Sequence, residues 1–89
     1  MDKEMLLYFG KEYTNLYRRM DKLDNKHEEA GKAGDTTKLH RIEKKIEYVD
    51  GKMDGIMAVL WKLGYTTKYV ADRDAYIIVE QTPCYINIR

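Results

Sequence analysis

The side chains with the clearest capacity for chemistry are the two histidines. His27 and His40 lie on either side of a short glycine-bearing segment, and Asp24 and Glu43 each lie one helical turn from one of them. If the flanking segments pack against each other, two imidazoles and two carboxylates approach, and such a set can bind a divalent metal. No HExxH or EF-hand spacing supports this site. We therefore expect His27 to be a tolerated helix-contact residue, His40 to be solvated, and the chain to hold no metal and no cofactor.

Groups that could form a catalytic site are sparse. Cys84 is the only cysteine, which excludes an internal disulfide and a cysteine metal pair. It follows Pro83, and no histidine lies near it in the sequence to act as a base. The chain also has no glycine-rich phosphate loop, nucleophile elbow or paired-carboxylate motif. We predict that the protein is not an enzyme.

Basic residues gather in two places and are the candidates for contacts to nucleic acid. They are Arg18, Arg19, Lys38, Arg41, Lys44 and Lys45. Cations in the first turns of a helix oppose its dipole, and phosphate binding would explain their presence there. A solvated face is the favoured interpretation, because Glu47 and Asp50 follow at once and Glu28 and Glu29 should lie near enough to pair with these cations.

Eight tyrosines in 89 residues raise the possibility of a stacking platform for single-stranded nucleic acid. The candidate rings are Tyr65, Tyr69, Tyr76 and Tyr85. Such platforms need interleaved basic residues, yet residues 65–89 contain three basic and three acidic side chains. Tyrosine also forms strands well and covers half-buried faces. We favour the structural role.

Two long amphipathic helices must position all these groups. In the first helix, apolar or tolerated residues follow a 3-4-3-4-3 spacing at Tyr13, Leu16, Met20, Leu23, His27 and Ala30. In the second, the 3-4 spacing continues without a miss through Leu39, Ile42, Ile46, Val49, Met53, Ile56, Leu60 and Leu63. This seven-residue repeat predicts an antiparallel two-helix coiled-coil hairpin, with helices over about residues 2–30 and 36–63.

After Gly64 the composition changes to tyrosine, threonine, isoleucine and valine, which is typical of strands. Residues 65–70 and 76–80 flank a loop at 71–75, and residues 85–89 alternate in a way that allows a short edge strand. The predicted fold is therefore a single α+β domain over residues 1–89. It consists of the helical hairpin followed by a small antiparallel β-hairpin or three-stranded meander at about residues 65–89.

The end of the helical hairpin formed by residues 5–9 and 56–63 is apolar on all sides, more than one helix contact can hide. We expect the strands or another subunit to cover it. Gly51 and Gly55 share one helix face and require a close neighbour, since each costs a helix interior about 1 kcal/mol. An aromatic ring from the strands is the favoured neighbour, and a second subunit's helix is the alternative. The candidate oligomer-interface residues are Leu6, Phe9, Gly51, Gly55, Met57 and Trp61.

Composition limits the class of function. The net charge is +1, so the whole molecule has no strong field to attract nucleic acid or an anionic membrane. No stretch has the roughly 20 apolar residues of a membrane helix. We expect a small soluble cytoplasmic protein, a protein–protein interaction or scaffolding module that forms a homodimer or binds an unknown protein partner. A nucleic-acid-binding regulator of bacterial or phage type is the alternative.

Overall fold

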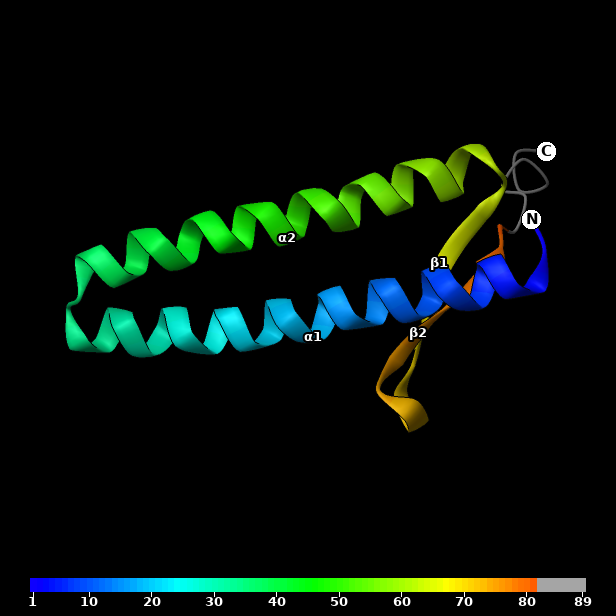
Figure 1. The fold of residues 1–89 in the computed structure, drawn as a ribbon. Helices are drawn as coiled ribbons and strands as arrows, with labels where there is room; N and C mark the ends of the chain where they lie inside the picture. The colour runs from blue at the N-terminus through cyan, green and yellow to red at the C-terminus, as the bar shows by residue number, and fades with distance from the viewer. Residues whose placement is uncertain (82–89) are drawn as a thin grey trace, which may run out of the picture.

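The computed structural model describes residues 1–81, in which two long helices lie side by side and antiparallel (Figure 1). Helix α1 spans Lys3–Ala33 and helix α2 spans Thr36–Lys62. Asp2 and Asp35 cap the two N-termini, each accepting a hydrogen bond from a backbone N–H three residues on. Helix α1 runs three residues beyond the predicted end near residue 30. Gly31 stays helical, and the chain turns instead at Gly34, whose φ of 70° is left-handed.

The contact line between the two helices, here called the seam, is the main core of the protein. Its buried residues are Leu16, Leu23, Ala30, Ile42 and Val49. All five come from the predicted heptad positions, so the antiparallel two-helix hairpin is confirmed. Leu60, also from the heptad series, is fully buried but lies outside this cluster, toward the end of α2.

A two-stranded antiparallel sheet follows the helices, as predicted. Strand β1 spans Tyr65–Val70 and strand β2 spans Ala75–Glu80, with Tyr65 opposite Glu80 and Val70 opposite Ala75. Gly64, with φ 88°, allows the chain to leave α2 and enter β1. The connection is a 3₁₀ turn at Ala71–Arg73. The predicted edge strand at residues 85–89 lies outside the described residues.

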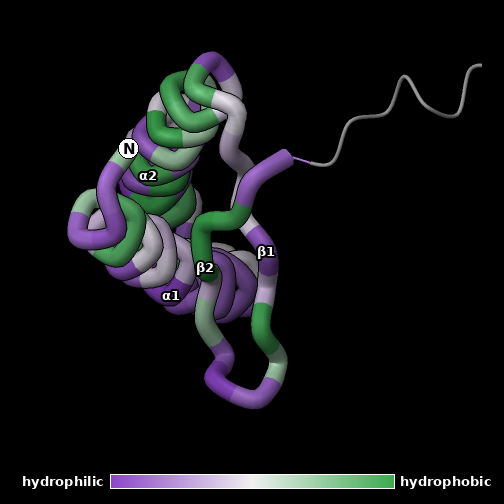
Figure 2. The backbone as a smooth tube through the Cα atoms, turned by 90° about the vertical axis from the view of Figure 1, so that its right-hand side faces the viewer, coloured by the Kyte–Doolittle hydropathy of each residue, from purple (hydrophilic) through white to green (hydrophobic). Residues whose placement is uncertain are grey.

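The β-hairpin lies along one side of the helix pair, with β2 beside α1 (Figure 2). The sequence led us to expect that either the strands or another subunit would cover the apolar end, here called the base. Instead β2 crosses α1 at Gly10 and Thr14, where the lack of a large side chain lets the strand approach. A Cβ atom on Gly10 would lie only 3.4 Å from the backbone oxygen of Tyr76. Part of the base therefore stays open to solvent.

The molecule is elongated, with principal extents of 52 × 34 × 25 Å. The two helices alone form a narrow arm at the end that contains the turn near Gly34. The β-hairpin thickens the other half of the molecule (Figure 1). Within residues 1–81, neither helix has the length and hydrophobicity needed to span a membrane.

Candidate functional site

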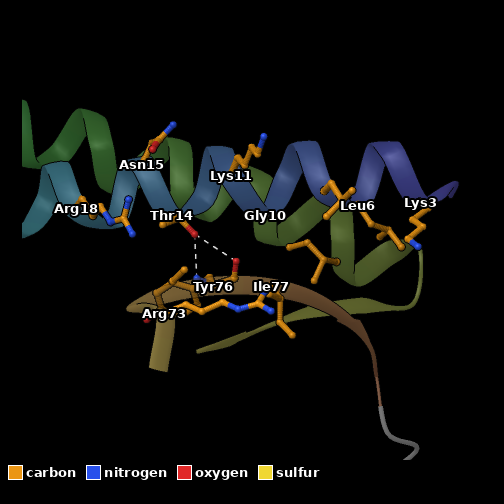
Figure 3. A pocket seen from close by; sticks show the side chains of 13 residues that line it. Lys3, Leu6, Gly10, Lys11, Thr14, Asn15, Arg18, Arg73, Tyr76 and Ile77 are labelled. Atoms are coloured by element: carbon orange, nitrogen blue, oxygen red, sulfur yellow. Dashed lines mark hydrogen bonds between the residues drawn. The ribbon is translucent and has the colours of Figure 1, made fainter. Parts of the chain in front are cut away.

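An open groove of about 520 Å³ runs between α1 and β2 (Figure 3). Its apolar lining comes from both elements: Leu6, Leu7 and Gly10 from α1, and Ala75, Ile77 and Ile78 from β2. Its charged lining is entirely basic: Lys3, Lys11, Arg18 and Arg73. None of these four cations forms an ion pair with any of residues 1–81. The groove therefore combines an apolar floor with uncompensated positive charge.

Thr14 hydrogen-bonds α1 to β2, the two elements that form the walls of the groove. Its hydroxyl accepts a hydrogen bond from the N–H of Tyr76 at 2.9 Å and donates one to the carbonyl oxygen of the same residue at 3.2 Å (Figure 3). Thr14 is 6% exposed, so water competes little for these groups. Both backbone groups of Tyr76 thus point toward α1 and away from β1, which leaves β2 as an edge strand facing the helix.

The tip of the hairpin is held at two further points. The guanidinium of Arg18 donates to the backbone oxygen of Asp74 at 3.1 Å, and the hydroxyl of Tyr69 donates to the Asp74 carboxylate at 2.6 Å. The hydrogen bond to Asp74 is the main cause that raises the pKa of Tyr69 to about 12, with desolvation and the charge of Asp74 adding to it. Asp74 has a left-handed φ of 47°.

Four tyrosines pack the hairpin against α1. The rings of Tyr13 and Tyr17 each lie 5.0 Å from the ring of Tyr76 between centroids, and Tyr69 lies 5.3 Å from Tyr76. Burial, followed by the neighbouring Tyr76, raises the pKa of Tyr13. Tyr69 and Tyr76, two candidate stacking rings, are thus part of the packing between elements. Tyr65 is half-buried.

Large apolar side chains remain exposed, most of them at the base. Those more than half exposed are Leu7, Tyr8, Tyr48, Val59, Trp61 and Leu63. The predicted interface residues divide between two environments: Gly51, Gly55 and Trp61 are exposed, whereas Leu6, Phe9 and Met57 are half-buried. The expectation that a strand ring packs on Gly51 and Gly55 is wrong for residues 1–81. A Cβ atom added at either glycine would meet nothing within 4 Å.

The six predicted nucleic-acid contacts come from both helices. Arg18 binds the hairpin tip, whereas Lys38, Arg41, Lys44 and Lys45 lie exposed in the first turns of α2. Arg19 lies 15 residues from Gly34 on α1 and Lys45 lies 11 residues from it on α2, so in the antiparallel hairpin the two differ by only about 6 Å along the helix axes. Glu28 pairs with Lys32 of its own helix at 3.5 Å, and no ion pair among residues 1–81 joins Glu28 or Glu29 to the candidate cations of α2.

The two histidines approach each other through a shared carboxylate. Nε2 of His27 lies 3.2 Å from Glu43, and Nδ1 of His40 lies 3.5 Å from the same side chain. Within the described part of the chain, no group of three or more histidine, cysteine, aspartate or glutamate side chains has a geometry suited to a metal ion. Asp24 is exposed and takes part in none of these ion pairs.

The sequence interpretation missed the groove because it followed only the heptad stripe of α1. A second stripe was available in Leu6, Gly10, Thr14 and Tyr17, at spacings of four, four and three. Glycine and threonine on this stripe leave room for another element to approach, and the structure buries both of them. The basic residues around it are spread between α1 and the hairpin tip, so only the tertiary contact brings them together.

The chain matches none of the protein families, curated proteins or solved structures with which it was compared. Its function must therefore be argued from the geometry described above.

Proposed function

We propose that this protein is an interaction module that self-associates through the outer face of α2, defined as Tyr48, Gly51, Gly55, Ala58 and Val59. Successive residues of an α-helix are separated by about 100°, which puts this face on the side of α2 away from the buried Val49. The supporting observation is the open space over the two glycines beside half-exposed Tyr48 and Val59. Small residues flanked by apolar ones let two helices approach closely and bury the side chains of Tyr48 and Val59 on either side.

A second copy of this chain is the partner that the face fits best. A two-fold axis would bring two identical outer faces together, Gly51 of one copy near Gly55 of the other. The neighbouring Trp61 and Leu63 at the base would enlarge the contact toward the roughly 800 Å² per partner of a stable interface. Nucleic-acid binding by the candidate cations is supported less well, because Arg18 is already engaged by the backbone of Asp74 at the tip of the β-hairpin.

Self-association is tested by measuring the molar mass of the protein by light scattering after size-exclusion chromatography at micromolar concentration. We expect the native chain to elute at twice its mass of 10.6 kDa. The variant Gly55→Glu should elute at the monomer mass, since a charge is placed in the contact. It should nevertheless fold, because no described atom outside the surrounding helix backbone lies within 4 Å of the new Cβ and glutamate has a helix propensity about 0.5 kcal/mol better than glycine.

The matched control is Asn25→Glu, which adds the same side chain at an exposed position of α1 and should leave the dimer intact. A native chain that runs as a monomer would refute self-association. A dimer that survives Gly55→Glu would show that another face forms the contact.

A further inference from the structure

We infer that the groove between α1 and β2 binds an extended, acidic peptide segment whose apolar side chains enter the groove while its carboxylates meet Lys3, Lys11 and Arg73. This inference rests on the proposed role as an interaction module but uses a different surface. It concerns a partner other than a second copy.

The apolar floor of the groove requires an apolar occupant. Leu7 is 60% exposed and Ile77 is 36% exposed, and both line the groove. Covering such side chains removes apolar surface from water, which favours binding of an apolar group. The volume of about 520 Å³ lies within the usual range for ligand pockets, roughly 300–1,000 Å³.

The charge of the groove requires an anionic occupant with more than one negative group. Lys3 and Arg18 are 15 residues apart on α1, or about 22 Å, and Lys11 lies between them. No acidic side chain lines the groove, and none of residues 1–81 pairs with its cations. A ligand with a single carboxylate, such as a fatty acid, can contact only one end of this row of cations. Carboxylates spaced along a peptide meet the whole row.

Two backbone groups of β2 at the groove favour an occupant with a peptide backbone. Tyr76 directs both of its backbone groups at Thr14, and Gln81 donates its N–H to the oxygen of Gly64 at 2.9 Å. The backbone N–H and carbonyl groups of successive residues point to opposite edges of a strand. Those of Ile78, two residues after Tyr76, therefore also point to the edge facing α1. Neither group has a hydrogen-bond partner outside the strand pairing among the described residues. Ile78 lines the groove, so the backbone of a peptide lying in it can hydrogen-bond to these two groups.

Two other occupants fit less well. Single-stranded nucleic acid needs exposed rings for stacking, yet the ring of Tyr76 is packed against Tyr13 and Tyr17, and the other large apolar groups of the groove are aliphatic. The last eight residues of the chain, 82–89, contain no aspartate or glutamate and one arginine, so their side chains do not complement the cations.

The test uses an alternating leucine–aspartate peptide of about eight residues, since about seven residues at 3.3 Å each span the row of cations. The full chain, isotopically labelled, is titrated with this peptide and followed by the amide NMR signals. We expect saturable shifts centred on Gly10, Lys11 and Ile77, with affinity that falls as salt rises. The same titration with leucine–lysine peptide should produce no saturable shift.

Charge-reversal variants test whether the peptide binds in the groove. The double variant Lys11→Glu and Arg73→Glu should weaken peptide binding by about tenfold or more, as attraction becomes repulsion. The control Lys44→Glu and Lys45→Glu makes the same change in net charge on the exposed arm and should bind within about twofold of the native chain. The variant Gly55→Glu should bind the peptide unchanged, so a failure of self-association and a failure of the groove are separate results.

Several outcomes would overturn the inference. They are the absence of saturable binding up to about 1 mM peptide, equal loss of binding in both double variants, and shifts centred on the arm. Binding of dodecanoate or of a single-stranded oligonucleotide at Gly10 and Ile77, with no binding of the peptide, would assign the groove to another class of ligand.

Discussion

Thr14 is the residue through which the hairpin is hydrogen-bonded most directly to α1. Its hydroxyl satisfies both backbone groups of Tyr76 in a part-buried setting. Thr14→Val keeps the shape of the side chain but leaves an N–H and a carbonyl unpaired. We expect the free energy of unfolding in urea to fall by about 1–3 kcal/mol. Thr14→Ser retains the hydroxyl and should lose much less stability than Thr14→Val. A Thr14→Val variant as stable as the native chain would contradict this role of the hydroxyl.

Tyr69 provides a pH-dependent contribution to stability. Its hydrogen bond to Asp74 raises its pKa from 10.0 to about 12, so the folded state holds this proton more tightly than the unfolded state. The interaction with Asp74 that raises this pKa stabilises the fold fully below pH 10. Its contribution to stability is lost as the pH rises from 10 to about 12. We expect the stability difference between the native chain and Tyr69→Phe to shrink across that interval.

The titration itself can be observed directly. In an alkaline titration followed by tyrosinate absorbance, one residue of the native chain should ionise near pH 12, and this step should be missing in Tyr69→Phe. Asp74→Asn removes the charge and the strong acceptor while tolerating the left-handed backbone, so it should return the pKa of Tyr69 toward its ordinary value. An unchanged pKa in Asp74→Asn would mean that Asp74 is not the cause.

At the scale of elements, α1 serves two contacts at once. One stripe, through Leu16 and Leu23, packs on α2, and a second, through Gly10 and Thr14, receives β2. Residues with small side chains make the second contact possible, because a strand can approach a helix closely only where no large side chain separates the backbones. The groove forms beside this crossing, and its cations come from both elements.

Helix α2 depends on a buried residue beyond the main seam. Leu60 has no exposed surface, whereas Leu7 is 60% exposed. In the Gly55→Glu background, where a monomer is expected, Leu60→Ala should lower the free energy of unfolding by about 2–5 kcal/mol. Leu7→Ala deletes the same atoms from an exposed site and should change it by about 0.5 kcal/mol or less. Similar effects in both variants, measured by denaturant unfolding, would contradict the burial pattern described here.

At the scale of the whole molecule, the two proposed surfaces lie on different elements. The outer face of α2 points away from the seam, and the groove belongs to α1 and β2. A dimer formed through α2 would therefore keep both grooves accessible and bind one peptide per chain. The net charge of +1 does not reveal the local positive charge of the groove, whose lining contains four cations and no acidic side chain.

The helical hairpin and the strand order could be predicted from the sequence, because both depend on local periodicity. A 3-4 repeat places Ile42 and Val49 on one side of a helix whatever surrounds it, and capping by Asp2 or Asp35 needs only neighbouring backbone groups. The open face at Gly51 and Gly55 could be located from the sequence, but the expected ring on it is absent among residues 1–81.

The sequence by itself determined which segments become helices and strands, and which stripe of each helix is apolar. Only the tertiary structure decided where the hairpin lies, since that depends on how Gly10, Thr14 and Tyr76 meet across 62 residues of chain. The groove follows from this contact. Its cations Lys11 and Arg73 are far apart in sequence, and no local pattern connects them until β2 crosses α1.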